Sequence, residues 1–426
     1  MSLAGGICVL VAASGASWEA RALQQLSTGA PGIVVLKRCV DLNDLLASAA
    51  TGQAQVSLVA YGLPGLDADS VDHLRRSGLS VVVVAEPVEL DQGGADRVRR
   101  LGIEHIVESG SIESLNEAVF LAGADTQPVA HRVDVEQGAA SLERAEPGRM
   151  LAVWGPTGAP GRTTVAVGLA AELVNRGAQT LLVDADGFGG AVAQHLGVLD
   201  EMSGLLAAAR MANAGQLDGD RLATLARAVN PTLRVLTGLP RADRWAEVRD
   251  SGFNQLLELA CTIAEYVVLD TAFSLETDAN TSLGSSAPHR NAMTLASLEQ
   301  ADEVIVVGSA DPVGLARLAR GLVELLEAVP GGTVRIVINR TRPSLGWGEK
   351  EVRAMIEGFV TPASVHFLPD DRGAADRALV SGKTLVELGD SALRRGISGL
   401  VDAVTGQAGS TGSRRWLRHR TEGTSH

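Results

Sequence analysis

Short apolar runs alternate with amphipathic segments over the first 122 residues. The runs are rich in valine, isoleucine and leucine, and each is followed by residues with helical apolar spacing. The five runs are "ICVLVAA", "IVVLKRC", "VSLVAYG", "LSVVVVAE" and "IEHIVE". Alternation of this kind predicts strand–helix units that assemble into a doubly wound parallel sheet.

The same pattern resumes at residue 149, where the apolar strand "RMLAVW" leads into a glycine-rich loop and an apolar helix that ends at Gly177. Residues 123–148 between the two patterned regions are polar and show no periodicity, which is typical of a linker. We therefore expect an α/β protein with two doubly wound parallel-sheet domains, at 1–122 and 149–405, and a basic disordered tail at 406–426.

Composition limits the classes of protein that fit this pattern. The chain has 426 residues, 46% of them hydrophobic, which is enough for two buried cores. No apolar stretch approaches the ~20 residues of a membrane span, and the cysteines Cys8, Cys39 and Cys261 lack metal-ligand spacing. These features predict a cytoplasmic protein. A net charge of −13 argues against a surface that coats nucleic acid.

The order of the first five units resembles the receiver domains of response regulators, but the residues that carry receiver chemistry are missing. In receivers the phosphate-accepting aspartate stands four residues before the proline of the loop that follows the third strand. Counting back from Pro64 reaches Ala60, which has no oxygen to phosphorylate. Ala12 and Ala13 replace the acidic pair that would bind Mg²⁺, and "VESGS" lacks the expected lysine. We therefore expect a pseudo-receiver with a structural or partner-binding role.

The segment "WGPTGAPGRTT", residues 154–164, lies between a predicted strand and a predicted helix, which is the context of a phosphate-binding loop. Backbone N–H groups of such a loop and the helix N-terminus both favour an anion. The spacing of the ordinary Walker motif is not met, but residues 157–164 resemble without gaps the deviant Walker motif of the ParA/MinD family. That resemblance implies binding of ATP or ADP with Mg²⁺ by Gly158, Ala159, Pro160, Gly161, Arg162, Thr163 and Thr164.

Three residues depart from this motif at chemically important positions. Thr157 replaces the family's signature lysine, which reaches the phosphates of the partner subunit, and Ala159 replaces a glycine. Arg162 replaces the loop lysine and keeps a positive charge as a planar fork, while Thr163 keeps the hydroxyl directed at Mg²⁺. We expect nucleotide binding to persist and hydrolysis to be weak, because catalysis needs the charges that are missing. A glycine turn in a vestigial fold is the alternative.

Acidic residues follow in the order that the ParA/MinD family has them. "TLLVDAD" resembles the family's second strand and switch I, which implies that Asp184 lies near Mg²⁺ and that Asp186 positions the attacking water. "EYVVLDTA" resembles the Walker B strand and implies Asp270 as a further Mg²⁺ residue beside Thr163 and Asp184. Ala272 replaces the proline or glycine that the family usually has in switch II.

Two later segments resemble the family's base-binding region. "RIVINRTRP" implies that Asn339 contacts adenine, and "VHFLPDD" implies that Pro369 packs on the base. The polar loop at 274–294 is a candidate switch or partner surface, because long polar loops in compact domains are commonly functional. Its Arg290 could reach a phosphate, but we expect a solvated side chain in a chain so rich in arginine.

A receiver-like domain followed by a MinD-like domain is the arrangement of the CpaE/TadZ group, and the chain also resembles its actinobacterial members. The resemblance implies a homodimer whose nucleotide state positions pilus-assembly or septum machinery. Two alternatives stay open: a nucleotide-independent scaffold, and a chromosome-partitioning ATPase, which the acidic chain disfavours. The tail, with Trp416 and Leu417 among four arginines, fits either peripheral membrane contact or a disordered solubilising end.

Overall fold

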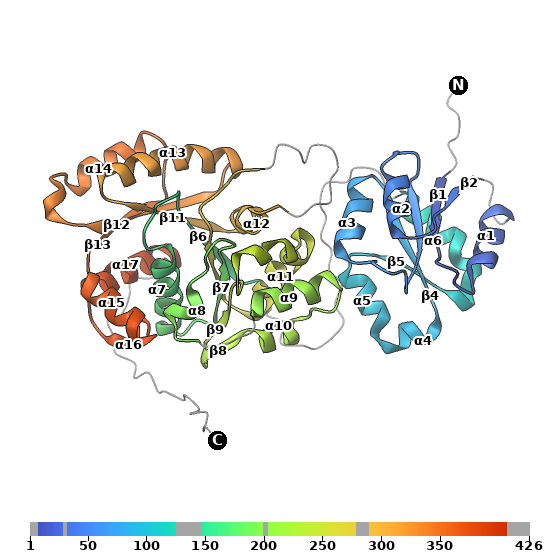
Figure 1. Cartoon of the computed structure of the whole chain (residues 1–426), viewed down its shortest axis with the longest axis horizontal. Helices are drawn as coiled ribbons and strands as arrows, with labels where there is room; N and C mark the ends of the chain where they lie inside the picture. The colour runs from blue at the N-terminus through green and yellow to red at the C-terminus, as the bar shows by residue number, and fades with distance from the viewer. Residues whose placement is uncertain (1–6, 29–31, 125–145, 199–202, 278–288, 407–426) are drawn as a thin grey trace, which may run out of the picture. The chain divides into compact units, whose positions relative to one another are not determined.

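The chain forms two compact units, shown in Figure 1 as a computed structural model. The described residues are 7–28, 32–124, 146–198, 203–277 and 289–406. Most of the predicted linker, residues 278–288 of the polar loop and the predicted tail beyond Gly406 lie outside the described residues. Each unit is built around a sheet of its own.

The first unit has a five-stranded parallel sheet in the order β2-β1-β3-β4-β5. β4 has a neighbour on each side, and its residues Val82, Val83 and Val84 are fully buried. Such burial on both faces explains why this predicted strand is a continuous apolar run. The strands are β1 Ile7–Ala12, β2 Ile33–Arg38, β3 Val56–Ala60, β4 Ser80–Ala85 and β5 His105–Glu108.

Helices connect successive strands of this sheet, so the predicted doubly wound fold is confirmed. Asp41 and Asp67 begin two of the helices by accepting the backbone N–H groups of Asp44 and Ser70, which would otherwise lack partners. The elements are α1 Glu19–Thr28, α2 Leu42–Ala49, α3 Ala68–Arg76, α4 Pro87–Glu89 with the π-helical turn Leu90–Gly94, α5 Ala95–Arg100, the 3-10 segment Ser109–Ser114 and α6 Leu115–Ala124.

The second unit has an eight-stranded sheet in the order β13-β12-β11-β6-β10-β7-β9-β8, in which β8 pairs antiparallel to β9 and the other pairs are parallel. β8 and β9 are not among the predicted strands, because each has only four residues and β8 is partly exposed. The strands are β6 Arg149–Trp154, β7 Thr180–Ala185, β8 Arg227–Asn230, β9 Leu233–Leu236, β10 Tyr266–Thr271, β11 Glu303–Ser309, β12 Thr333–Thr341 and β13 Ser364–Pro369.

Helix α7, Arg162–Asn175, begins directly after the glycine-rich loop and is buried over most of its length. It packs between the sheet and α17, Ala392–Thr405, and Gly168 permits this contact because a Cβ there would lie 2.7 Å from Ile397 Cδ1. The other helices are α8 Val192–His195, α9 Gly204–Asn213, α10 Gly219–Leu225, η3 Ala242–Glu247, α11 Asp250–Ile263, α12 Ala292–Gln300, α13 Pro312–Ala328, η5 Pro343–Leu345, α14 Glu349–Glu357, α15 Arg372–Ser381 and α16 Leu385–Leu388.

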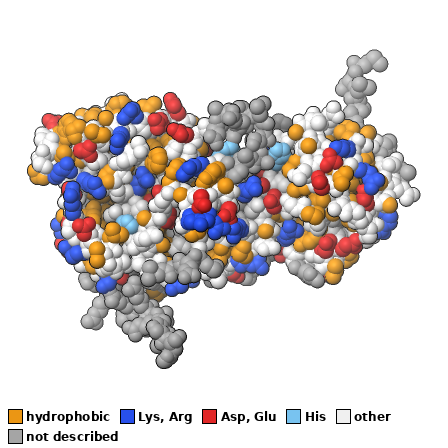
Figure 2. Space-filling view, in the orientation of Figure 1, with side chains coloured by type: hydrophobic (Ala, Val, Ile, Leu, Met, Phe, Trp, Pro, Cys, Tyr) orange, Lys and Arg blue, Asp and Glu red, His pale blue; other side chains and the backbone are white. Residues whose placement is uncertain are grey.

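Positive and negative side chains are interspersed on the face of the molecule in Figure 2. No extended region of one sign is visible among the described residues of that face. Within the described ranges, no helix combines the length and the apolar character needed to cross a bilayer.

A buried ion pair fixes α7 against α17, and its loss should destabilise the second unit. Arg394 Nε donates to Glu172 Oε1 at 2.7 Å, and the Glu172 side chain is only 4% exposed. Arg394→Ala leaves this carboxylate buried without its cation, so we expect the free energy of unfolding to fall by about 2 kcal/mol or more. Arg395→Ala is the matched control, because Arg395 is 63% exposed and pairs with Asp390 at the surface. If urea denaturation shows an equal fall in the free energy of unfolding for the two variants, the prediction is contradicted.

Candidate functional site

The glycine-rich loop joins the end of β6 to the start of α7, at the carboxyl edge of the second sheet. Gly158 and Gly161 adopt left-handed backbone conformations, with φ of 71° and 95°. Gly161 must also lack a side chain, because a Cβ there would overlap Asn339 Nδ2. These two positions therefore require glycine.

Thr163 and Asp270 connect the first turn of α7 to β10. Thr163 Oγ1 donates a hydrogen bond of 2.7 Å to Asp270 Oδ2. Asp270 is about 1% exposed, and within the described part of the chain its Oδ1 atom has no partner. Burial raises the pKa of Asp270 to about 7, although the Thr163 hydrogen bond and the charge of Arg162 act in the opposite direction.

Asp184 lies beside Asp270, because β7 and β10 pair in parallel with these two residues in register. Its carboxylate accepts the backbone N–H groups of Val192 at 3.1 Å and Asp186 at 3.3 Å. A Cβ at Gly190 or Gly238 would overlap the carboxylate, so the chain closes around it. Burial, and next the charge of Asp270, raise the pKa of Asp184 well above its usual value.

Arg162 spans the loop and the turn after β7. Its Nη2 lies 3.6 Å from Asp186 Oδ2, and its Nη1 donates to the Gly155 carbonyl at 3.3 Å. Both side chains are largely buried, with 16% exposed for Arg162 and 12% for Asp186. Asp186 Oδ1 also accepts the N–H groups of Phe188 and Gly189, so the Asp186 side chain stabilises the turn that follows β7. The structure thus brings the loop cation to the predicted water-positioning residue.

Asn339 reaches the loop from β12. Its Nδ2 donates to the Pro160 carbonyl at 2.9 Å, and its Oδ1 accepts the N–H of Arg340. Pro369 ends β13 and is in register with Thr341 of β12. Asn339 therefore binds the loop itself in this structure, and Pro369 lies farther along the same edge of the sheet.

The remaining predicted loop residues, Ala159, Pro160 and Thr164, are all partly exposed. Among the described residues, no group of three or more His, Cys, Asp and Glu side chains could hold a metal ion by itself. Any Mg²⁺ at the loop would therefore depend on phosphate oxygens or water for most of its ligands.

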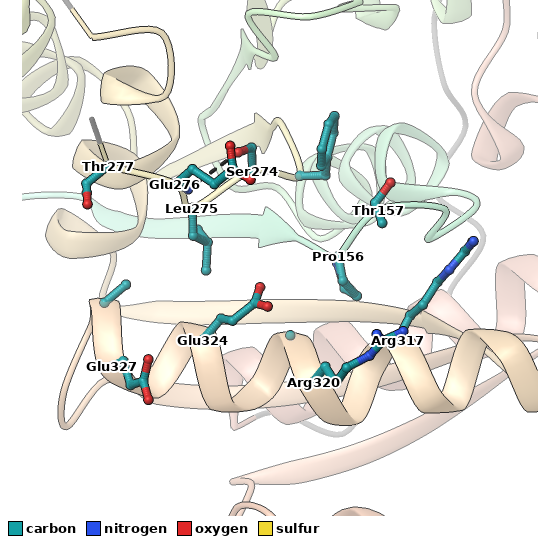
Figure 3. A pocket seen from close by; sticks show the side chains of 13 residues that line it. Pro156, Thr157, Ser274, Leu275, Glu276, Thr277, Arg317, Arg320, Glu324 and Glu327 are labelled. Atoms are coloured by element: carbon teal, nitrogen blue, oxygen red, sulfur yellow. Dashed lines mark hydrogen bonds between the residues drawn. The ribbon is translucent and has the colours of Figure 1, made fainter. Parts of the chain in front are cut away.

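A pocket of about 650 Å³ opens beside the loop, and sequence reasoning missed the residues of its far wall. Pro156 and Thr157 face Arg317, Arg320 and Glu324 of α13 across it (Figure 3). The sequence does contain a sign of this wall, because arginines occur at a three-residue spacing in an amphipathic helix. Such arginines are not distinctive in this chain, which has only three lysines and carries nearly all its positive charge as arginine.

Arg290, at the end of the polar loop, is stacked on an aromatic ring. Its guanidinium carbon lies 4.2 Å from the centre of the Phe188 ring, which in turn lies 5.1 Å from the Phe273 ring. The side chain is exposed, as expected for a solvated arginine, but the cation–π contact orders it.

The carboxyl edge of the first sheet has no acidic residue at the expected receiver positions. Ala12 and Ala60 are the last residues of β1 and β3. Glu86, just after β4, accepts hydrogen bonds from the hydroxyls of Ser17 at 2.8 Å and Ser109 at 2.5 Å. The Ser109 bond is the larger cause that lowers the pKa of Glu86. A fixed carboxylate thus bridges the segments after β1 and β5.

No protein-family model matches the sequence, and no curated protein matches it. A ParA family ATPase from Chlorobium tepidum TLS matches the structure with a TM-score of 0.50 and 19% identity, over 59% of this chain and 98% of that chain. The cell division ATPase MinD of Pyrococcus furiosus matches with a TM-score of 0.48 and 18% identity, over 61% and 99%. The septum site-determining protein MinD of Pyrococcus horikoshii OT3, complexed with Mg-ADP, matches with a TM-score of 0.49 and 17% identity, over 60% and 96%.

The chain contains the fold of a ParA family ATPase. At 19% identity the likeness establishes the fold alone, and the predicted P-loop fold of MinD/ParA type is confirmed. Residues 154–164 join β6 to α7, and Asp184, Asp270 and Asn339 lie with this loop at the carboxyl edge of the parallel strands. Ligands of open α/β sheets bind at that edge.

The raised pKa of Asp270 predicts a pH dependence of stability. Between about pH 4 and about pH 7 the unfolded carboxyl is ionised while the folded one keeps its proton. The folded state then binds more protons, so the free energy of unfolding falls as the pH rises through this window. Asp270→Asn removes this contribution. In urea titrations of the variant, we expect the free energy of unfolding to fall less across the same pH range.

Asp243→Asn is the control for this pH series, because Asp243 is 69% exposed on the surface. It should leave the native pH profile unchanged. A fall in stability as steep in Asp270→Asn as in the native chain would show that another group is responsible.

Proposed function

We propose that the second unit is a nucleotide-binding switch that takes ATP or ADP with Mg²⁺ and hydrolyses ATP weakly. The observation that carries this proposal is the hydrogen bond from Thr163 Oγ1 to Asp270 Oδ2. In P-loop proteins a loop hydroxyl and a Walker B aspartate hold the Mg²⁺ that bridges phosphate oxygens. Here the two groups are in contact at the start of α7, next to the left-handed glycines of the loop.

Two buried atoms without partners support the fit of these residues to a metal-bound nucleotide. Asp270 Oδ1 and Arg162 Nε make no hydrogen bond to any described residue, although buried polar atoms are normally paired. A water on Mg²⁺ would satisfy the carboxylate oxygen, and a phosphate oxygen would satisfy the guanidinium. Backbone N–H groups between Gly158 and Thr164 would supply the remaining phosphate contacts.

Bound Mg²⁺ would neutralise charge on the phosphate oxygens. Asp184, held by the backbone N–H groups of Asp186 and Val192, would help to hold the Mg²⁺, and Asp186 would orient a water molecule. Arg162 must give up its contacts with Asp186 and the Gly155 carbonyl to bind a phosphate. This exchange reduces the net amount by which Arg162 stabilises the phosphate charge. Thr157 carries no charge. Together these features support weak turnover with retained binding.

The proposal extends to a homodimer that positions pilus-assembly or cell-division machinery, on the strength of the ordered ParA/MinD motifs and the receiver-like unit before them. The first unit would serve as a partner-binding pseudo-receiver, since Ala60 cannot accept a phosphoryl group. A cytoplasmic location, with the basic tail in contact with a membrane, completes the proposal; the tail lies outside the described residues.

A nucleotide-independent scaffold is the second candidate, and one observation favours it. The loop is already tied down by protein contacts, because Asn339 donates to Pro160 and Arg162 pairs with Asp186. A partitioning ATPase that coats DNA is less well supported, since the chain has a net charge of −13 and the charges in Figure 2 are mixed.

Nucleotide affinity and turnover separate the switch from the scaffold. We expect the native chain to bind ATP and ADP in calorimetry and to release phosphate far more slowly than the Thr157→Lys, Arg162→Lys double variant. Loss of such a cation costs about 10³-fold in phosphoryl transfer. No binding at millimolar nucleotide would leave the scaffold as the function. Equal hydrolysis by the two proteins would disprove the role assigned to Thr157.

The first unit should not respond to phosphodonors. Incubation of the full chain with acetyl phosphate and Mg²⁺ should leave its mass unchanged, because Ala60, Ala12 and Ala13 supply neither an acceptor oxygen nor metal ligands. Intact-mass spectrometry followed by peptide mapping tests this. A stoichiometric phosphate adduct within the first unit would refute the pseudo-receiver interpretation.

A further inference from the structure

One face of α13 borders the P-loop. Arg317, Arg320 and Glu324 lie at helical spacing on this face and line the pocket of about 650 Å³ opposite Pro156 and Thr157 (Figure 3). The pocket also adjoins the segment Phe273–Thr277 that follows β10. It therefore lies over the ends of β6 and β10, the strands that precede Pro156 and Phe273.

Arg317 reaches the loop directly. A Cβ placed at Gly158 would overlap Arg317 Nη1, so the guanidinium occupies the space that the missing side chain leaves. In Figure 3 the side chain extends from α13 toward the loop that carries Thr157. Arg317 is half-buried, and it makes no hydrogen bond or ion pair within the described part of the chain. Its charge is therefore available at the loop without the loss of an existing ion pair.

Packing fixes the distance between α13 and the loop. Gly321 faces Pro156, since a Cβ at Gly321 would lie 2.8 Å from Pro156 Cβ and 3.2 Å from the Trp154 ring. At the start of the helix, Asp311 accepts the backbone N–H groups of Val313 and Gly314. The helix is thus held at both positions, one turn on each side of Arg317.

We propose that Arg317 is a phosphate-binding residue that contacts the terminal phosphate of a bound nucleoside triphosphate from within the same subunit. This inference rests on the proposed nucleotide binding at the P-loop. The guanidinium is a planar fork that matches phosphate oxygens, and it lies beside Thr157, where the loop has no charge of its own.

The terminal phosphate is the group within reach because of the order of the strands. If the base lies at β12 and β13, near Asn339 and Pro369, the phosphate chain runs along the edge toward β6 and β10. Arg317 contacts Gly158, at the start of the loop over β6. Arg162, at the opposite end of the loop, is held by Asp186 and is separate from this contact.

The test compares a non-hydrolysable ATP analogue with ADP in calorimetry on the full chain. Arg317→Gln should weaken binding of the ATP analogue by about tenfold or more, and change ADP affinity by less than about twofold. Arg317→Lys should recover part of the loss. Arg320→Gln removes the same charge from the same pocket one turn away and should change neither affinity by more than about twofold.

Thermal unfolding without nucleotide should be unchanged in Arg317→Gln, which separates a binding loss from a folding loss. Three outcomes would overturn the inference while leaving the proposed nucleotide binding intact. Arg317→Gln could lose equal affinity for the ATP analogue and for ADP, it could lose no affinity, or Arg320→Gln could have an equal effect. If the native chain binds neither nucleotide, the proposed function and this inference both fall.

Discussion

The burial of two aspartates side by side at the sheet edge constrains the rest of the second unit. Asp270 and Asp184 are in register on neighbouring strands, and each is about 1% exposed. A buried carboxylate is costly unless hydrogen bonds or opposite charges surround it, or it takes up a proton. The surroundings supply such partners: Thr163 donates to Asp270, and the N–H groups of Asp186 and Val192 donate to Asp184.

These requirements account for the geometry of the loop even where its residues depart from the ParA/MinD motif that they resemble. Gly190 and Gly238 must be small because the Asp184 carboxylate fills the space beside them. The first turn of α7 must approach β10, because Thr163 satisfies one oxygen of Asp270. Arg162 keeps a positive charge between the loop and Asp186, close enough to lower the pKa of Asp270. A lysine is therefore not needed to hold the loop in place.

The sequence was informative where its signals are local. Asp184 and Asp270 end continuous apolar runs, so the position of these aspartates at the carboxyl ends of the strands was predictable. β8 and β9 were not predicted, because each strand has only four residues, too few to show a clear alternation of apolar and polar positions. The contact of Asn339 with Pro160 joins residues 179 positions apart, and the approach of Arg317 to Gly158 likewise depends on tertiary packing. Neither leaves a pattern along the chain.

If the second unit is the proposed nucleotide-binding homodimer, the location of the cation decides how nucleotide binding and dimer formation are linked. In the ParA/MinD motif that residues 157–164 resemble, a lysine at the position of Thr157 acts on the partner subunit's phosphates. Triphosphate affinity would then depend on association, and association on triphosphate, by the same factor. A cation on α13 of the same subunit is present in the monomer and in the dimer alike. In the proposed role it would contribute to triphosphate affinity in both states and would add nothing to the coupling between them. If Arg317 has this role, a dimer of this chain must gain its dependence on nucleotide from other residues near the loop, such as those of Phe273–Thr277 in the wall of the same pocket.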